Sequence, residues 1–344
     1  IRTMVLTGCV LSAVIPAAFL IPTFQRSSAG LTEGLVSENL RVRAQFVASE
    51  LARGLYTHWR EIEATAGLFE SGLEPSQTRP ILDRIAVRQE KYAWVGLAAP
   101  DGKVLSATRG LLEGQDVGQR PWFRAGLQGP FAGDVHEAVL LQKLLQPAST
   151  EPMRFVDFAT PIRRGDGAFV GVLGAHLDWT WVEGLIQGAR RDGAIDVMLV
   201  SRERTVLVGH ESLQGKVLDL PSLRAAQQGS TRSFVETWPD GVTYLTAIVP
   251  TVAYRNLPSF GWSVVVRQPV TAALEPLRAA ARNAALAFAA AILLVVLVGL
   301  YISARLSAPL RRLEAAAGAL AEGRTDQPMP EARANSRTST TRMP

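Results

Sequence analysis

The chain has 344 residues, 47% of them hydrophobic, and a net charge of +5. This length allows two or three domains. The modest charge, with no basic run interleaved with aromatic residues, argues against a nucleic-acid-binding protein. The only cysteine, Cys9, excludes an intramolecular disulfide framework, so an exported region would be held together by its own core.

Two segments of the chain carry no charged residue, namely residues 3–25 and 283–304. Each is longer than the roughly 20 residues that a helix needs to cross the hydrocarbon core of a membrane. We therefore predict a transmembrane helix in each. The first segment contains Pro16 and Pro22, and a cleaved signal peptide is the alternative for it.

Arginines directly follow the second apolar segment, at Arg305, Arg311 and Arg312. Because positive charge marks the cytoplasmic end of a membrane helix, we expect the chain after residue 305 to be cytoplasmic. With two spans, residues 26–282 then lie outside the cytoplasm.

The region from 27 to 74 is predicted to form a long stalk helix. No proline occurs between Ser27 and Gly72, and apolar or small residues recur at steps of three and four, with His58 filling one gap: Leu51, Leu55, Ile62, Ala66 and Phe69. We interpret His58 as a packed residue of this seam and not as a ligand contact.

Residues 75–190 have the pattern of an antiparallel sheet with helices packed on it. Two apolar runs flank Pro100-Asp101-Gly102 within residues 92–109, which predicts a hairpin. Residues 155–179 provide two more strands around the turn at Arg164–Gly167, and a short helix follows.

The same pattern recurs more weakly in residues 191–275. Strand–turn–strand signals appear at 194–210 and 231–250, a short helix at 222–229 and a last strand at 261–270. The predicted fold class is therefore α+β, with a long N-terminal stalk helix, two tandem PAS-like antiparallel-sheet modules and two transmembrane helices.

The arrangement resembles the double Cache domain of bacterial transmembrane receptors over about residues 27–275. The hairpin turn Pro100-Asp101-Gly102, the motif Arg120-Pro-Trp-Phe123 and the run Asp166-Gly167 to Gly171-Val-Leu-Gly174-Ala-His176 carry the resemblance. It implies that the membrane-distal module, residues 75–190, binds a small ligand and that the proximal module, residues 191–275, relays the signal. It also implies a bacterial inner membrane, with residues 26–282 in the periplasm.

Residues 305–330 resemble the first helix and connector of a HAMP linker. Leucine and alanine recur there at steps of four and three, as in a coiled-coil seam, at Leu306, Leu310, Leu313, Ala317 and Leu320. A seam of this kind requires a partner helix, so we expect a homodimer. The tail, residues 331–344, is rich in Ser, Thr and Arg and is predicted to be disordered.

The resemblance also implies a ligand grip. In amino-acid-binding members of the family, an Arg-x-Trp-aromatic motif holds the ligand carboxylate, and Arg120, Trp122 and Phe123 match it. A guanidinium binds a carboxylate through two parallel hydrogen bonds. The aspartate that holds the ligand ammonium in those members is replaced here by His176, which favours a carboxylate, a dicarboxylate or another anion over an α-amino acid. The alternative is that the two aromatic residues belong to the core and that Arg120 is a surface charge.

Four further residues are candidates for the same pocket. His136 and Glu137 are expected in a loop beyond the Arg-Pro-Trp-Phe motif. Asp157 is expected to face away from its apolar neighbours, toward pocket or solvent, and Asp178 shares a strand face with His176. Zinc could in principle bind His136, Glu137, His176 and Asp178, but no short ligand pair and no cysteine supports this, so we predict neither a metal nor a cofactor.

No catalytic motif is visible in the sequence, and we predict a non-enzymatic transmembrane sensor. One alternative is a membrane-anchored protein that docks a periplasmic protein partner. Another is an enzyme with an exported hydrolytic site, which the lack of a nucleophile–base pair around His136 and His176 would dismiss. No diguanylate cyclase, histidine kinase or chemotaxis output domain is recognisable, so the chain, which starts at Ile1, is either a piece of a longer product or acts alone.

Overall fold

The computed structural model describes residues 2–71, 75–88, 91–145, 153–190 and 195–321. In the first helix, the side chains are described from Glu33 onward. Two compact units divide the chain, one of residues 32–274 and the other of the residues at the two ends. The class is α+β, with one long N-terminal helix and two antiparallel sheets, as the sequence predicts.

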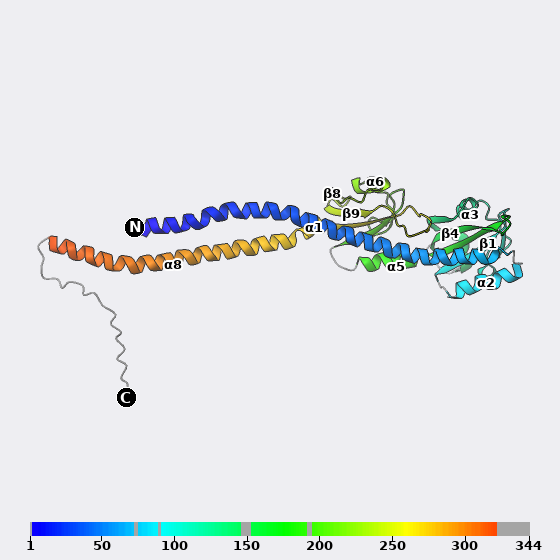
Figure 1. The fold of residues 1–344 in the computed structure, drawn as a ribbon, viewed down its shortest axis with the longest axis horizontal. Helices are drawn as coiled ribbons and strands as arrows, with labels where there is room; N and C mark the ends of the chain where they lie inside the picture. Colours follow the sequence, from blue (N-terminus) through cyan, green and yellow to red (C-terminus); the bar gives the residue numbers. More distant parts are fainter. Residues whose placement is uncertain (1, 72–74, 89–90, 146–152, 191–194, 322–344) are drawn as a thin grey trace, which may run out of the picture. The chain divides into compact units, whose positions relative to one another are not determined.

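The first helix, α1, runs without interruption from Arg2 to Phe69. It contains both the first predicted membrane segment and the predicted stalk, and it ends five residues before the predicted boundary at 74. Its part beyond residue 32 passes alongside both sheets (Figure 1). The side chains of the first predicted span, residues 3–25, lie outside the described part, so this span stays a prediction.

A second long helix, α8, covers Glu275–Ala321. Its segment Glu275–Arg305 is long and apolar enough to cross a membrane, with a mean hydropathy of 2.8 over its most apolar 18 residues, and it is the one such helix among the described residues. Its large apolar side chains, such as Leu293 and Leu294, are exposed. This segment contains the second predicted span. The helix α8 continues through the HAMP-like seam, but most side chains of that seam lie outside the described part. Residues 322–344, which include the predicted tail, also lie outside it.

The first sheet has five strands in the order β2-β1-β5-β4-β3, all antiparallel. The turn at residues 99–103 joins β1 to β2, which confirms the predicted hairpin. The elements of this region are α2 (Pro75–Arg88), β1 (Tyr92–Ala98), β2 (Val104–Ala107), η1 (Thr108–Gly110), α3 (Pro121–Gly126), β3 (Phe131–Glu137), α4 (Val139–Leu145), β4 (Arg154–Arg163), β5 (Phe169–Asp178) and α5 (Thr180–Ala189).

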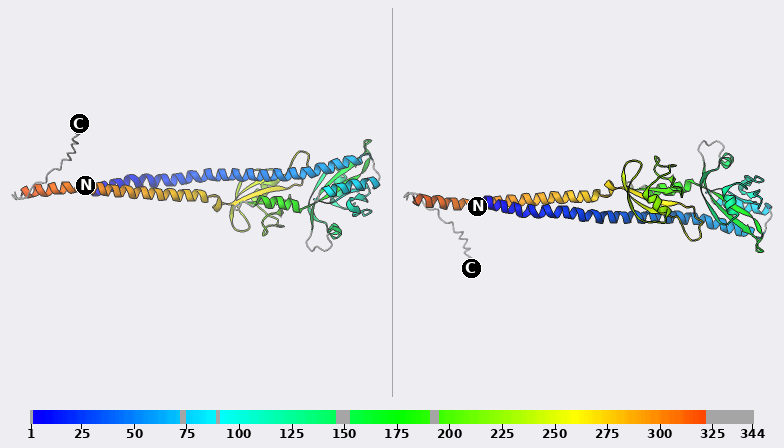
Figure 2. Two further views of the ribbon diagram at one scale, coloured as in Figure 1. Left: turned by 90° about the horizontal axis from the view of Figure 1, so that it is seen from below. Right: turned by 90° about the horizontal axis from the view of Figure 1, so that it is seen from above.

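The second sheet repeats the topology, with the order β7-β6-β10-β9-β8. Each strand falls within a segment where the sequence predicts one, and the short helix α6 occupies the place of α3. The elements are β6 (Asp196–Val200), β7 (Val206–Val208), α6 (Pro221–Gln227), β8 (Phe234–Thr237), β9 (Thr243–Val249), β10 (Ser263–Pro269) and α7 (Val270–Ala273). Figure 2 gives two further views of both sheets.

One continuous core joins α1 to a face of each sheet. Leu51, Leu55 and Trp59 of α1 are almost completely buried there, together with Phe158 of the first sheet and Val264 of the second. Stepping by three or four residues puts these α1 side chains on one helical face, as the sequence pattern predicts. His58 is buried beside them, so its interpretation as a packed stalk residue is confirmed.

Three elements of the first module are missing from the sequence prediction, namely α2, β3 and α4. Pro75 and Pro80 suggested a break in the chain, yet Pro75 begins α2, where a missing N–H leaves no hydrogen bond unmade. The segment Phe131–Glu137 contains Gly, Asp and His, which are weak strand formers, and it forms a strand because it pairs with the edge of β4.

Candidate ligand-binding site

A cavity of about 590 Å³ lies on the face of the first sheet that points away from α1. Val156 and Phe158 of β4 belong to the core around α1, so the residues that alternate with them, including Asp157, face the cavity side. The volume is in the usual range for a small-molecule pocket. The wall includes residues from four separate segments: Trp94, Leu112, Arg120, Trp122, His136 and His176.

The short helix α3 places the Arg-Pro-Trp-Phe motif at the cavity. Pro121 is its first residue, and Arg120 precedes it in an extended conformation, with φ −72° and ψ 136°. Trp122 is 3% exposed and its ring centroid lies 5.7 Å from that of Trp94, so the two indoles form one aromatic wall. Phe123 is also buried, but it packs in the core and does not line the cavity.

A glycine on the neighbouring strand makes room for Trp122. A Cβ atom on Gly174 of β5 would lie 2.5 Å from the Trp122 ring, closer than any real contact. The indole can therefore lie directly on the strand backbone beside His176. Gly174 belongs to the Gly-x-x-Gly run that the sequence singles out, and its role here is to provide space.

The guanidinium of Arg120 makes no ion pair with any residue in the described part of the chain. The residue is exposed and lines the cavity mouth. Arg124, one turn further along α3, is also exposed but is not part of the wall. Arg120 therefore presents an unpaired cation to the cavity, which its neighbour does not.

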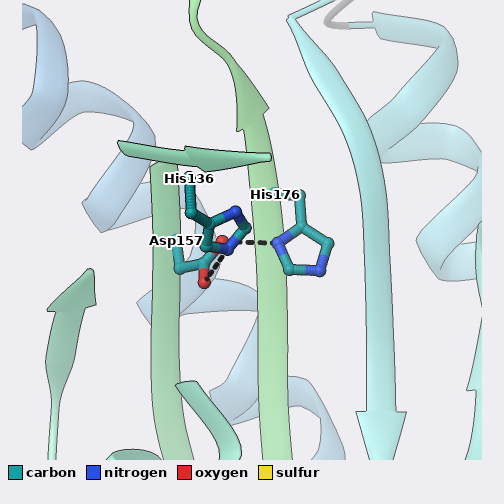
Figure 3. A group of neighbouring side chains, drawn as sticks. All are labelled: His136, Asp157 and His176. Carbon is teal, nitrogen blue, oxygen red and sulfur yellow. Dashed lines mark hydrogen bonds and ion pairs between the residues drawn. The ribbon is translucent and has the colours of Figure 1, made fainter. Parts of the chain in front are cut away.

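At the floor of the cavity, two imidazoles of the wall flank a buried carboxylate, Asp157, which is not itself part of the wall (Figure 3). His136 donates from Nε2 to Oδ2 of Asp157 at 2.7 Å, and His176 donates from Nδ1 to Oδ1 of Asp157 at 2.5 Å. Asp157 is 2% exposed, and both of its oxygens are satisfied in this way. The second nitrogen of His176, Nε2, makes no hydrogen bond to the described residues and remains available to the cavity.

A β-bulge brings His136 into this cluster. Gly133 pairs with Asp157, but Phe155 pairs with His136, so β3 holds one extra residue between these two pairs. In a regular pairing of the same sequence, His136 would pair with Arg154 and fall on the opposite face of the sheet, because side chains alternate along a strand. The expectation that His136 and Glu137 lie in a loop is therefore wrong; both are in β3.

The bulge also ties the first sheet to the second. Within it, the Asp134 carboxylate accepts hydrogen bonds from the Val135 amide and, at 2.7 Å, from the indole N–H of Trp262. Burial raises the pKa of this carboxyl, and the Trp262 hydrogen bond opposes that shift. The strand β3 thus contains both a cavity residue, His136, and a residue that bonds to Trp262, directly before β10.

The remaining predicted candidates divide between the cavity and other roles. Glu137 is exposed and lines the cavity. Asp178, the last residue of β5, accepts hydrogen bonds from the backbone N–H and the hydroxyl of Thr180 at the start of α5, and it is not part of the wall. Gln115, Asp116 and Lys143 also line the cavity, although no sequence motif marks them as candidates.

The second module has a smaller cavity, of about 400 Å³, beside α6. Arg202 and Arg204 line it, but Arg204 forms an ion pair with Asp219. The described wall of this cavity includes no aromatic side chain and no carboxylate, so it lacks the combination found in the first module.

Residues 24–277 match the sequence profile of a known family, the Cache domain (dCache_1). The chain belongs to the Cache domain family. None of the curated proteins matches it by sequence.

Solved structures of Cache domains share its fold at low sequence identity. The ligand-binding domain of the amino acid chemoreceptor PctC from Pseudomonas aeruginosa, in complex with GABA, is 17% identical with a TM-score of 0.53, and the match covers 69% of this chain and 99% of that one. The ligand-binding domain of the chemoreceptor Tlp3 from Campylobacter jejuni, in complex with 4-methylisoleucine, is 14% identical with a TM-score of 0.56, covering 71% and 95%.

A third similar structure is an extracellular ligand-binding receptor from Desulfohalobium retbaense, at 12% identity and a TM-score of 0.50. The match covers 66% of this Cache chain and 39% of the receptor's chain. At these identities the likeness concerns the fold.

Proposed function

We propose that this Cache protein is a non-enzymatic transmembrane sensor that binds a small extracytoplasmic carboxylate, or another anion, in the cavity of its first module. The observation that carries the proposal is the cavity mouth: Arg120 has no ion-pair partner among the described residues and stands beside the indole of Trp122. A guanidinium shielded by an aromatic face is well suited to a carboxylate.

The histidine floor supports an anion in preference to an α-amino acid. The α-amino acid alternative needs a carboxylate deep in the pocket for the ligand's ammonium group. The buried carboxylate of Asp157 accepts hydrogen bonds from two imidazole N–H groups and is not part of the cavity wall. The two carboxylates that do line the cavity, Asp116 and Glu137, are exposed to solvent. We therefore expect a simple carboxylate here in preference to the amino acids named with the solved structures of PctC and Tlp3.

The relay would follow the chain. The strand β10 leads through α7 into α8, whose apolar segment would cross the membrane. Because Asp134 of β3 bonds to Trp262, a change at His136 can alter the contact between the two modules. A ligand drives such a change only by its difference in affinity for two states.

A thermal-stability screen of the full chain in detergent tests the proposal. Small carboxylates, amino acids and amines are added singly, and ligand binding to the folded state raises the melting temperature. We expect a rise with a carboxylate that is lost in Arg120→Ala and kept in Arg124→Ala, which removes an equal charge four residues further along the chain, outside the cavity.

The screen also separates the alternatives. A rise that persists in Arg120→Ala would contradict the proposed grip. If no compound raises the melting temperature, the docking of a periplasmic protein becomes the better account of these modules.

A further inference from the structure

The cluster of His136, Asp157 and His176 has a feature that anion binding does not use. One potential ligand atom from each residue lies within 4.8 Å of the other two, and this is the one such trio of His, Cys, Asp or Glu side chains among the described residues. The three residues come from the neighbouring strands β3, β4 and β5, where Asp157 pairs directly with His176. We propose that this trio binds a divalent transition-metal ion of the zinc type at the floor of the cavity.

The donor set selects the class of metal. Two imidazoles and one carboxylate suit Zn²⁺, Co²⁺ or Ni²⁺, whereas Ca²⁺ and Mg²⁺ take oxygen ligands. Ligands about 2.1 Å from a tetrahedral ion are roughly 3.4 Å apart. The two N–H···O bonds of 2.5 and 2.7 Å would therefore open by somewhat less than an ångström, a shift within reach of side-chain rotation.

The metal would replace the two hydrogen-bonded protons between the imidazoles and Asp157. In the metal-bound form each imidazole carries its proton on the other ring nitrogen. In His176 that nitrogen is Nε2. In His136 it is Nδ1, which is buried and has no hydrogen-bond partner in the described structure. Because the Nδ1–H of His136 would lack a hydrogen-bond acceptor, we expect the affinity for the metal to be roughly ten- to a hundredfold lower than with a partner, and therefore moderate.

Three protein ligands leave the fourth position of a tetrahedral ion open. His136 and His176 both line the cavity, so this position is on the cavity side. If the proposed function holds, the second carboxylate of a dicarboxylate ligand can fill it while Arg120 holds the first. This last step rests on the proposed function; metal binding itself does not.

The test uses the full chain, produced without a histidine tag, purified in detergent and freed of metal with a chelator. Titration with Co²⁺ alone is followed by its visible absorption, which is intense in tetrahedral sites, and Zn²⁺ is then added as a competitor. We expect one Co²⁺ per chain, displaced by Zn²⁺. His136→Gln removes a ligand and should weaken Zn²⁺ binding by at least about a hundredfold.

Two further variants keep the result interpretable. Asp157→Asn keeps the shape of the carboxylate and removes its charge, and it should also weaken binding. His210→Gln removes an exposed histidine of the second module and should change nothing. Equal binding by the wild type, His136→Gln and Asp157→Asn, or no tetrahedral Co²⁺ spectrum, would overturn the proposal.

Repeating the carboxylate screen in excess chelator separates the two hypotheses. If a carboxylate still raises the melting temperature there and no tetrahedral Co²⁺ spectrum is seen, the sensor proposal stands and the metal proposal fails. If the Co²⁺ spectrum is seen but no carboxylate raises the melting temperature, the metal proposal stands and the sensor proposal fails.

Discussion

At the scale of single residues, the shape of the cavity depends on close contacts that leave no room for a larger side chain at Gly174. Gly174 lets the Trp122 indole lie on β5, and the same indole is part of the wall beside Arg120 and His176. The position of the aromatic wall is thus set by a residue without a side chain. Sequence reasoning selected Arg120, Trp122 and His176, but it could not foresee that Asp157 lies between the two histidines, because that depends on how β3, β4 and β5 pair.

The substitution Gly174→Ala tests this contact. The added methyl group would lie 2.5 Å from the Trp122 ring, so the indole must move. We expect a loss of roughly 1–3 kcal/mol of stability and a loss of the carboxylate-induced shift, measured by denaturant unfolding and by the thermal screen.

Gly184→Ala is the matched control, because no atom lies within 4 Å of a Cβ at this exposed helical glycine. It should stabilise the protein by up to about 1 kcal/mol and leave ligand binding unchanged. An equally tolerated Gly174→Ala, with binding intact, would show that Trp122 need not lie where the structure has it.

At the scale of elements, the strands with clear turn signals were predictable and the edge strand was not. Pro100-Asp101-Gly102 and the Arg164–Gly167 turn each separate two apolar runs, and hairpins form at both. The strand β3 has no such pattern, and within its bulge Asp134 bonds to Trp262, which is far away in the sequence. The site residue that was misplaced, His136, lies on this strand.

The contact of α1 with β1 and α5 gives a prediction on pH. His58 of α1 is 3% exposed and lies edge-on to the rings of Tyr92 and Trp181. Burial, with a smaller effect of Lys91, lowers the pKa of this imidazole to about 4 from its usual 6.5. Between pH 6.5 and 4 the unfolded chain therefore takes up a proton that the folded chain does not. The free energy of unfolding should fall over this window by up to about 3 kcal/mol on account of His58.

His58→Leu should remove this part of the pH dependence, and His210→Gln should not. Urea unfolding at pH 7, 5.5 and 4 measures it as the difference between each variant and the wild type. Parallel curves for the wild type and His58→Leu would mean that His58 is not held neutral by its packing.

At the scale of the whole molecule, the sequence predicted the fold class and the repeat of the sheet, because both modules are built from local strand and turn signals. The ligand cavity is different, since its wall comes from segments as distant as Trp94 and His176 and is complete only after folding. In the described part of the chain, each module has a candidate cavity. We expect the ligand in the first, where Arg120, Trp122 and the histidine floor meet.

The most direct test of that assignment is a crystal structure of the protein with the carboxylate that gives the largest thermal shift. We expect electron density for the ligand in the first module, with its carboxylate on the Arg120 guanidinium and against Trp122. Density for the ligand only in the second module, between α6 and Arg202, would contradict it.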